Sequence, residues 1–202
     1  LNSGRVLVAG GTSPDTSLAT ASSEELDPTT PAVHVSEYKF PAAVDPDVLG
    51  DRETELWASV HRPASLATGA RYPLIVMLHG NHATCGSGSN PRADIDCTYT
   101  TTGTCPAGFS VVPSHAGYRY IADELASRGY FVVSINANRG ITCALGAPGD
   151  EALIQARGNL VLKHLQHLSA WNRGVATTPA SLGVSFLNRL DFTQLGLMGH
   201  SR

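Results

Sequence analysis

Residues 73–82 read PLIVMLHGNH, and this stretch decides the fold of the chain. A proline enters a continuous apolar run, and a His-Gly pair leaves it. A strand with one exposed face alternates apolar and polar residues, whereas a strand covered on both faces is apolar throughout. The run therefore predicts a buried strand of a parallel sheet.

The chain ends on Gly199-His200-Ser201-Arg202, directly after the apolar stretch at residues 193–198. Glycine before a serine permits the sharp turn from a strand into a helix, because a larger side chain would clash there. The full pattern is Gly-x-Ser-x-Gly, and the sequence stops one residue before the second glycine. We expect a nucleophilic serine at the end of a central parallel strand, in a sequence that is cut within the motif.

Outside these two stretches the sequence predicts further strands and helices. The expected strands cover residues 35–40, 53–61 and 130–136, and the expected helices cover residues 117–128 and 150–171. Residues 53–61 alternate apolar and polar side chains, which is typical of an edge strand. Alternating strands and helices predict parallel pairing through right-handed crossovers.

Several finer features follow from the same patterns. Asp150 can cap the longer helix, and Gly129 stands just past the shorter one. His164 and His167 are expected at the surface or boundary of the longer helix. The long Gly- and Cys-rich connection at residues 81–114 shows no regular pattern and is expected to be a loop.

In this order of elements, residues 35–202 resemble the α/β-hydrolase family, in its lipase, esterase and cutinase-like branch. The resemblance implies a partial α/β-hydrolase fold of α/β class, with a mostly parallel sheet and flanking helices, truncated after the nucleophile strand. It implies hydrolysis of carboxylic esters through an acyl-enzyme on Ser201. It also implies an oxyanion hole made by the backbone N–H groups of Asn81 and Arg202, with His82 as the alternative to Asn81.

The family order of the triad is serine, then acid, then histidine. All eight histidines lie at or before His200, so the triad acid and histidine are expected downstream of Arg202. His200 is expected to point away from the serine, and Asp191 to be structural. The 202-residue chain by itself is expected to be almost inactive, because a serine without its base loses most of its reactivity.

The four cysteines are Cys85, Cys97, Cys105 and Cys143, all in loop-like sequence. They favour two disulfides and a secreted or periplasmic protein. Three connectivities are open. Because Cys85 and Cys143 both follow predicted parallel strands, they could pair, which would leave Cys97 with Cys105. Free thiols, or zinc bound by His79, His82, Cys85 and Cys97, are the alternatives, and no pair has the C-x-x-C spacing of a zinc site.

The composition is 42% hydrophobic and 15% charged with a net charge of −3, so no basic surface for nucleic acid is expected. No membrane span, metal or cofactor is expected, and no signal peptide is visible. Residues 1–30 resemble part of a kelch-type propeller blade, or form a polar leader, ahead of the hydrolase half at residues 31–202. The alternatives to an esterase are therefore a carbohydrate-binding module with a vestigial hydrolase part, or a non-ester reaction on the same fold.

Overall fold

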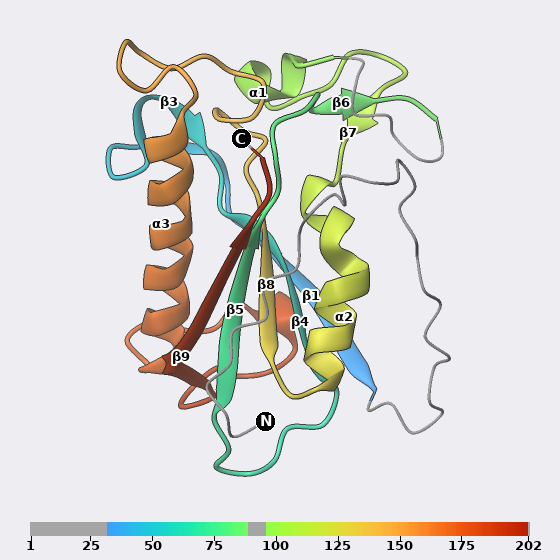
Figure 1. The fold of residues 1–202 in the computed structure, drawn as a ribbon, viewed down its shortest axis with the longest axis vertical. Coiled ribbons are helices and arrows are strands. Elements are labelled where there is room, and N and C mark those ends of the chain that lie inside the picture. Colours follow the sequence, from blue (N-terminus) through green and yellow to red (C-terminus); the bar gives the residue numbers. More distant parts are fainter. Residues whose placement is uncertain (1–31, 89–95, 202) are drawn as a thin grey trace, which may run out of the picture.

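The structure, a computed structural model, describes residues 32–88 and 96–201 and has an α/β architecture built on a mixed five-stranded sheet (Figure 1). The strands in spatial order are β1 (Val33–Lys39), β4 (Trp57–Pro63), β8 (Phe131–Asn136), β5 (Tyr72–Leu78) and β9 (Leu190–Gly199). Strands β8, β5 and β9 are parallel to one another, whereas β4 is antiparallel to both β1 and β8.

The expectation of a mostly parallel sheet is thus correct for the β8, β5 and β9 part alone. Strand β5 is the buried parallel strand predicted from residues 73–82. Strand β9 is parallel to it and lies at the edge of the described sheet, which agrees with a sheet expected to be truncated after the strand that precedes Ser201.

The prediction of an edge strand at residues 53–61 is wrong. Strand β4 lies inside the sheet, and residues 49–54 belong instead to β3 (Leu49–Thr54), which pairs with β2 (Ala43–Asp45). The alternation there does not mark a solvated face, because the polar side chains of Ser59 and His61 are buried. Burial is possible because they have hydrogen-bond partners beneath a helix.

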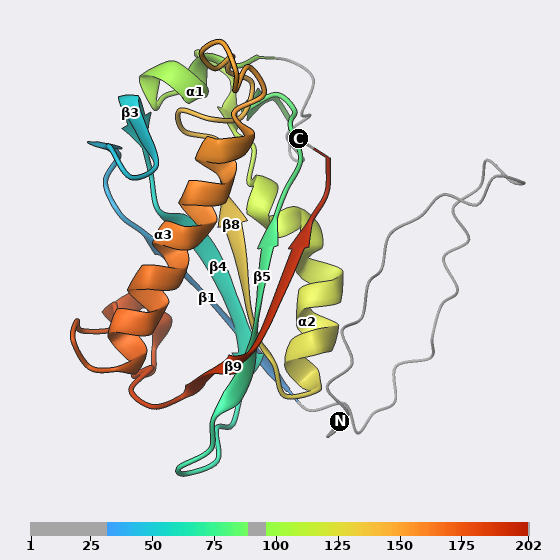
Figure 2. The same ribbon diagram turned by 60° about the vertical axis from the view of Figure 1, so that its left-hand side comes forward.

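The two longer helices cover opposite faces of the sheet, α3 (Ile154–Asn172) on one and α2 (Arg119–Ser127) on the other (Figure 2). Val76 of β5 faces the larger core, which includes Leu160 of α3. Met77, the next residue, faces the smaller core with Ala122 of α2. Both faces of β5 are therefore dry, which explains why its sequence is apolar without alternation.

The helix ends agree with the predicted signals. The Asp150 carboxylate accepts a hydrogen bond from the Ile154 N–H at 2.7 Å, and Gly129 follows α2 with a φ of 94°. His164 does not match its expected surface position, because it is fully buried. Its Nδ1 lies 2.6 Å from the Tyr38 hydroxyl, and burial lowers the pKa of His164 to about 3.

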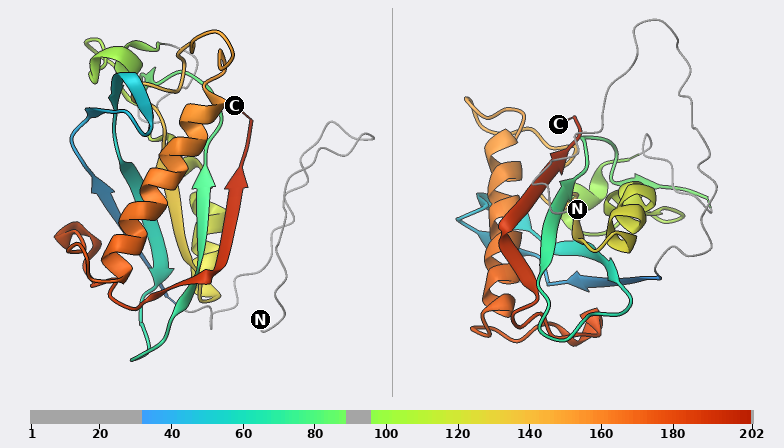
Figure 3. Two further views of the ribbon diagram at one scale, coloured as in Figure 1. Left: turned by 90° about the vertical axis from the view of Figure 1, so that its left-hand side faces the viewer. Right: turned by 60° about the horizontal axis from the view of Figure 1, so that its bottom comes forward.

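The connection expected to be a structureless loop contains short elements that lie beyond the carboxyl ends of β5 and β8 (Figure 1). They are β6 (Cys85–Gly86), α1 (Thr98–Thr102), β7 (Ser110–Val111) and a 3-10 helix (Ser114–Tyr118). A second 3-10 helix (Ala180–Leu182) precedes β9. Figure 3 shows that the carboxyl ends of β5 and β9 lie at the same end of the sheet, where the described chain also ends.

The kelch-like stretch at residues 1–30 lies outside the described residues. Across residues 32–88 and 96–201, no helix combines the length and apolar character needed to cross a bilayer.

Candidate active site at the carboxyl edge of the sheet

Ser201 lies two residues after the end of β9, in a backbone conformation that is uncommon for a serine. Its φ is 54°, in the left-handed region, and its side chain is exposed. Non-glycine residues in this region are strained, and such strain is concentrated at functional positions. The His200 N–H donates to the Leu78 carbonyl at 3.4 Å, so the turn is attached to the end of β5. A strained serine after a strand is one part of the expected nucleophile elbow, which also needs a helix after the serine.

Gly80 makes close contact with this turn. A Cβ placed on Gly80 would lie 2.8 Å from the His200 carbonyl oxygen and 3.0 Å from the Ser201 Cβ. Only glycine allows the segment after β5 to approach the serine so closely. The two motifs that the sequence analysis singled out, 120 residues apart in the chain, therefore meet in space.

Asn81 follows Gly80 and is exposed. Its side-chain oxygen accepts a hydrogen bond from the Cys143 N–H at 2.7 Å. His82, the alternative donor, is half-buried, and its Nδ1 lies 2.7 Å from the Ala83 carbonyl oxygen. Arg202 lies outside the described residues.

His79 fixes the segment that carries Gly80. Its Nδ1 lies 2.7 Å from the Gly80 carbonyl oxygen, and its Nε2 lies 2.9 Å from the backbone nitrogen of Ala137, after β8. The Ala137 N–H can only donate, so Nε2 accepts and Nδ1 carries the proton. Burial lowers the pKa of His79 to about 3, which keeps the ring neutral as this arrangement requires. Arg157 of α3 also donates to the His79 carbonyl oxygen.

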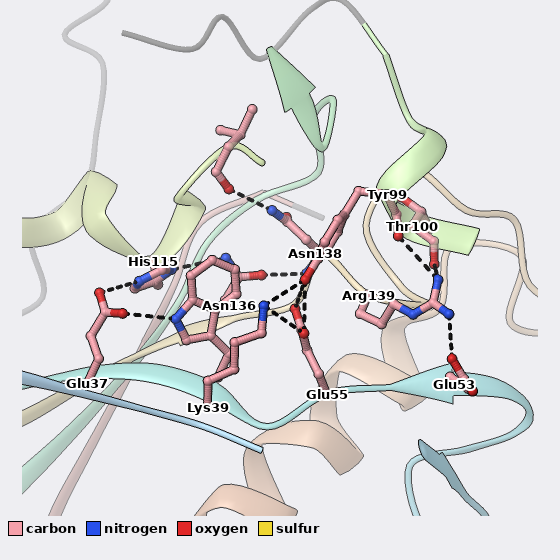
Figure 4. Close-up of polar contacts among 12 residues, drawn as sticks. Glu37, Lys39, Glu53, Glu55, Tyr99, Thr100, His115, Asn136, Asn138 and Arg139 are labelled. Carbon is pink, nitrogen blue, oxygen red and sulfur yellow. Dashed lines mark hydrogen bonds and ion pairs between the residues drawn. The ribbon is translucent and has the colours of Figure 1, made fainter. Parts of the chain in front are cut away.

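A partly buried polar network attaches α1 to the same end of the sheet (Figure 4). The Tyr99 hydroxyl donates to Glu55 at 2.9 Å, and Lys39 donates to the same hydroxyl at 2.9 Å. Arg139 donates to the Thr100 carbonyl at 3.1 Å. These contacts hold a helix of five residues that would not be stable alone.

A second part of this network holds the 3-10 helix that precedes α2. Asn136 lies 3.0 Å from His115 Nδ1, and His115 Nε2 lies 3.0 Å from Glu37 (Figure 4). Asn138 accepts a hydrogen bond from the Ser114 hydroxyl at 3.0 Å. Neither part was predicted from the sequence, although polar and apolar residues alternate where β8 ends, which was a usable signal.

All four predicted cysteines form disulfides, but the suggested pairing is wrong. The bonds join Cys85 to Cys105 and Cys97 to Cys143. Cys85 lies in the β6–β7 ribbon, and Cys143 pairs with Cys97 at the start of α1. With Cys85 and Cys97 in disulfides, neither is free to bind zinc as a thiolate. Among the described residues, no cluster of three or more potential ligands could hold a metal.

A different serine, Ser59, lies in a triad-like arrangement that was not predicted from the sequence. Ser59 Oγ lies 3.2 Å from His61 Nε2, and His61 Nδ1 lies 2.6 Å from an Asp123 oxygen. Ser59 and His61 are two apart on β4 and so share a face, which was the available signal. Ser59 is only 4% exposed, whereas Asp123 of α2 is half-buried. The serine hydroxyl, which would have to attack a substrate, therefore lies at the buried end of the three.

The structure leaves the base of Ser201 unassigned. Across the described residues, none of the eight histidines forms a hydrogen bond with the Ser201 hydroxyl. Asp191 lies at the far end of β9, where its carboxylate accepts from the Thr193 N–H at 3.0 Å. That position agrees with the structural role expected for it.

No protein-family model matches the chain, and a search among curated proteins finds no match. Solved structures give distant matches. One is a bacterial brefeldin A esterase, described as a homologue of human hormone-sensitive lipase, with 18% identity, 88% of this chain and 34% of that chain covered, and a TM-score of 0.38. Another is a ferulic acid esterase from Streptomyces cinnamoneus, with 15% identity, 85% and 52% covered, and a TM-score of 0.37.

An acylaminoacyl peptidase from Pyrococcus horikoshii matches at 16% identity and a TM-score of 0.35, with 83% of this chain and 19% of that chain covered. These structural neighbours are α/β-hydrolases. The chain spans between 19% and 52% of the length of these three structures. At such identities and TM-scores the likeness brings no activity to this chain.

Proposed function

We propose that this chain carries the nucleophile and both oxyanion donors of a serine esterase with an α/β-hydrolase fold. The observation that carries the proposal is the left-handed Ser201, exposed at the end of β9 and packed against Gly80. Residues 31–202 are the hydrolase part, and a carboxylic ester is the substrate class.

The proposed reaction begins when the Ser201 oxygen attacks the ester carbonyl carbon and its proton passes to a general base. The carbonyl oxygen becomes an oxyanion, which accepts hydrogen bonds from the Asn81 N–H and from the N–H of the residue after the nucleophile, Arg202. Collapse of this intermediate expels the alcohol and leaves an acyl-serine. Water then attacks the acyl-serine, releasing the acid and restoring the hydroxyl.

The general base is not among the side chains that contact Ser201 in the described residues. The proposal therefore places the triad histidine and acid outside these 202 residues and expects the chain alone to hydrolyse esters very slowly. Removing the base of a serine hydrolase costs about a millionfold in kcat. The exposed, strained Ser201 is positioned for attack, but no described side chain accepts its proton.

The two disulfides are consistent with an oxidising, extracytoplasmic location. We place the protein in the secreted or periplasmic class on this ground. Acyl esters in that setting, such as lipids and polyesters, are the proposed substrates.

The decisive experiment is covalent labelling of the full-length protein, as its source produces it, with a fluorophosphonate. Peptide mass spectrometry is expected to find the adduct on Ser201. The 202-residue chain alone is expected to label far more slowly, because no described side chain removes the proton of the serine.

Ser59 provides a matched control, because it has the histidine and the carboxylate that Ser201 lacks in the described residues. The Ser59→Ala variant is expected to label as the parent does, and Ser201→Ala not at all. An adduct on Ser59, or full labelling of Ser201→Ala, would overturn the proposal.

A further inference from the structure

The two disulfides do different things at the carboxyl edge of the sheet. The Cys85–Cys105 bond closes part of the connection after β5 upon itself, across 20 residues of sequence. The Cys97–Cys143 bond spans 46 residues and joins the start of α1 to the segment after β8. Only the second one links two different connections that border the candidate active site.

Cys143 has an unusual backbone conformation that its surroundings hold in place. Its φ is 68°, in the left-handed region that favours glycine. The preceding residue is also fixed, because the Thr142 N–H donates to the Ala137 carbonyl at 2.9 Å and the Thr142 carbonyl accepts from the Thr100 hydroxyl at 2.7 Å. The direction of the Cys143 N–H is therefore set from α1, by the disulfide on one side and by Thr100 on the other.

That N–H donates to the side-chain oxygen of Asn81 at 2.7 Å. Asn81 follows Gly80, whose position is set by contact with the elbow and by His79. The hydrogen bond from Cys143 restrains the asparagine from its other side. Because this contact is exposed to solvent, the hydrogen bond alone is weak. The Cys97–Cys143 disulfide restrains the donor residue and so keeps its N–H directed at Asn81.

We infer that the Cys97–Cys143 disulfide is a positioning device for the Asn81 amide, acting through the Cys143 N–H. The inference rests on the proposed function, in which the Asn81 N–H stabilises the oxyanion. An oxyanion donor contributes most when it is already aligned before the charge appears, and small misplacements are costly. Asn81 and Cys143 are positioning residues in this account, since the side chain of neither touches the reacting atoms.

The same link makes the site sensitive to reduction. A dithiol reductant transfers two electrons and two protons to the disulfide, giving the thiols of Cys97 and Cys143 and a cyclic oxidised dithiol. Cys143 is then free to leave its strained left-handed conformation, and its N–H no longer points at Asn81. Reduction is therefore expected to slow ester hydrolysis without unfolding the sheet.

The test compares three variants of the full-length protein with the parent, using a p-nitrophenyl acyl ester as substrate. The variants are Asn81→Ala, the double variant Cys97→Ser/Cys143→Ser, and the matched control Cys85→Ser/Cys105→Ser. The first two are expected to lose about tenfold in kcat with KM almost unchanged, because only the transition state carries the oxyanion. The control is expected to keep its kcat, and thermal unfolding confirms that each variant is folded.

A second measurement does not depend on catalysis. Amide hydrogen exchange at residue 143 is expected to accelerate in Asn81→Ala and in Cys97→Ser/Cys143→Ser, but not in the control. Equal kcat values for the two disulfide variants, or unchanged exchange at residue 143 in Asn81→Ala, would overturn the inference. If the parent itself hydrolyses no ester, the proposed function fails, and the exchange rates alone then decide whether the disulfide restrains Asn81.

Discussion

Two serines in this molecule have opposite merits as nucleophiles. Ser59 has the complete series of hydrogen bonds, to His61 and on to Asp123, but it is 4% exposed beneath α2. Ser201 has no such series among the described residues, yet it is exposed, strained and packed against Gly80. The comparison shows that a serine with a triad-like series of hydrogen bonds can be buried, and that an exposed serine can lack one. Access for the substrate and a donor for the oxyanion count as much as the triad does.

The largest expected effect separates the two serines directly. Ser201→Ala is expected to reduce kcat/KM of the full-length protein for a p-nitrophenyl ester by about a millionfold, since the nucleophile is lost. Ser59→Ala is expected to leave kcat/KM within about twofold, because its hydroxyl serves the interior and not the substrate. Steady-state kinetics measure both, and a large loss in Ser59→Ala in a protein that remains folded would reverse the assignment.

The second effect tests the contact that distinguishes Ser201. Gly80→Ala adds a methyl group where the His200 carbonyl oxygen and the Ser201 Cβ leave no room. The elbow or the Asn81 segment must then move, and we expect kcat to fall about a hundredfold. Gly117→Ala is the matched control, because a Cβ there has no neighbour within 4 Å. Equal activity of the two variants would show that the close approach is dispensable.

The third effect concerns stability and pH. Burial lowers the pKa values of His79 and His164 to about 3, whereas both titrate near pH 6.5 in the unfolded chain. Between these values the unfolded state binds more protons, so the free energy of unfolding falls as the pH falls. Each histidine contributes at most about 1.4 kcal/mol per pH unit.

Urea denaturation between about pH 7.5 and pH 4 measures this slope. His79→Gln removes one of the two buried titrations and is expected to make the decline shallower. His34→Gln, at a half-buried position on β1, leaves both titrations in place and serves as the control. If the free energy of unfolding falls with pH as steeply in His79→Gln as in the parent, a neutral, hydrogen-bonded His79 is contradicted.

The smallest effect belongs to the triad-like cluster. Asp123→Ala leaves a buried nitrogen of His61 without its partner, which is expected to cost about 1–3 kcal/mol of stability. The ester kinetics are expected to stay unchanged. Chemical denaturation and kinetics on the same sample check both halves of the prediction. A loss of activity at full stability would mean that His61 and Asp123 serve the chemistry after all.

The sequence was sufficient to locate the buried strand at residues 73–82, both longer helices, the Asp150 cap and the serine turn. These features depend on local signals, namely continuous apolar runs, helical periodicity and glycine before a turn. Gly80 and Ser201 were paired correctly because each has its own motif, although nothing local shows that they meet.

The failures have a common physical cause. The alternation at residues 53–61 predicts an edge strand whose polar side chains face water. Instead α2 supplies Asp123 as a partner for His61, so Ser59 and His61 are buried. His164 was misplaced for the same reason, since its partner, Tyr38, comes from a strand 126 residues away. The disulfide pairing also depends on how distant loops fold, and spacing does not encode that. A local sequence pattern does not predict which distant residue will become the partner of a buried polar group or a cysteine.

The central claim is that Ser201 is the nucleophile and that the Asn81 N–H faces the oxyanion. A crystal structure of the full-length protein bearing a phosphonate adduct tests it most directly, because the phosphonyl oxygen occupies the oxyanion position. We predict phosphorus bonded to Ser201 Oγ, with that oxygen about 2.7–3.1 Å from the Asn81 nitrogen. An adduct on another residue, or a phosphonyl oxygen directed away from Asn81, would contradict the account.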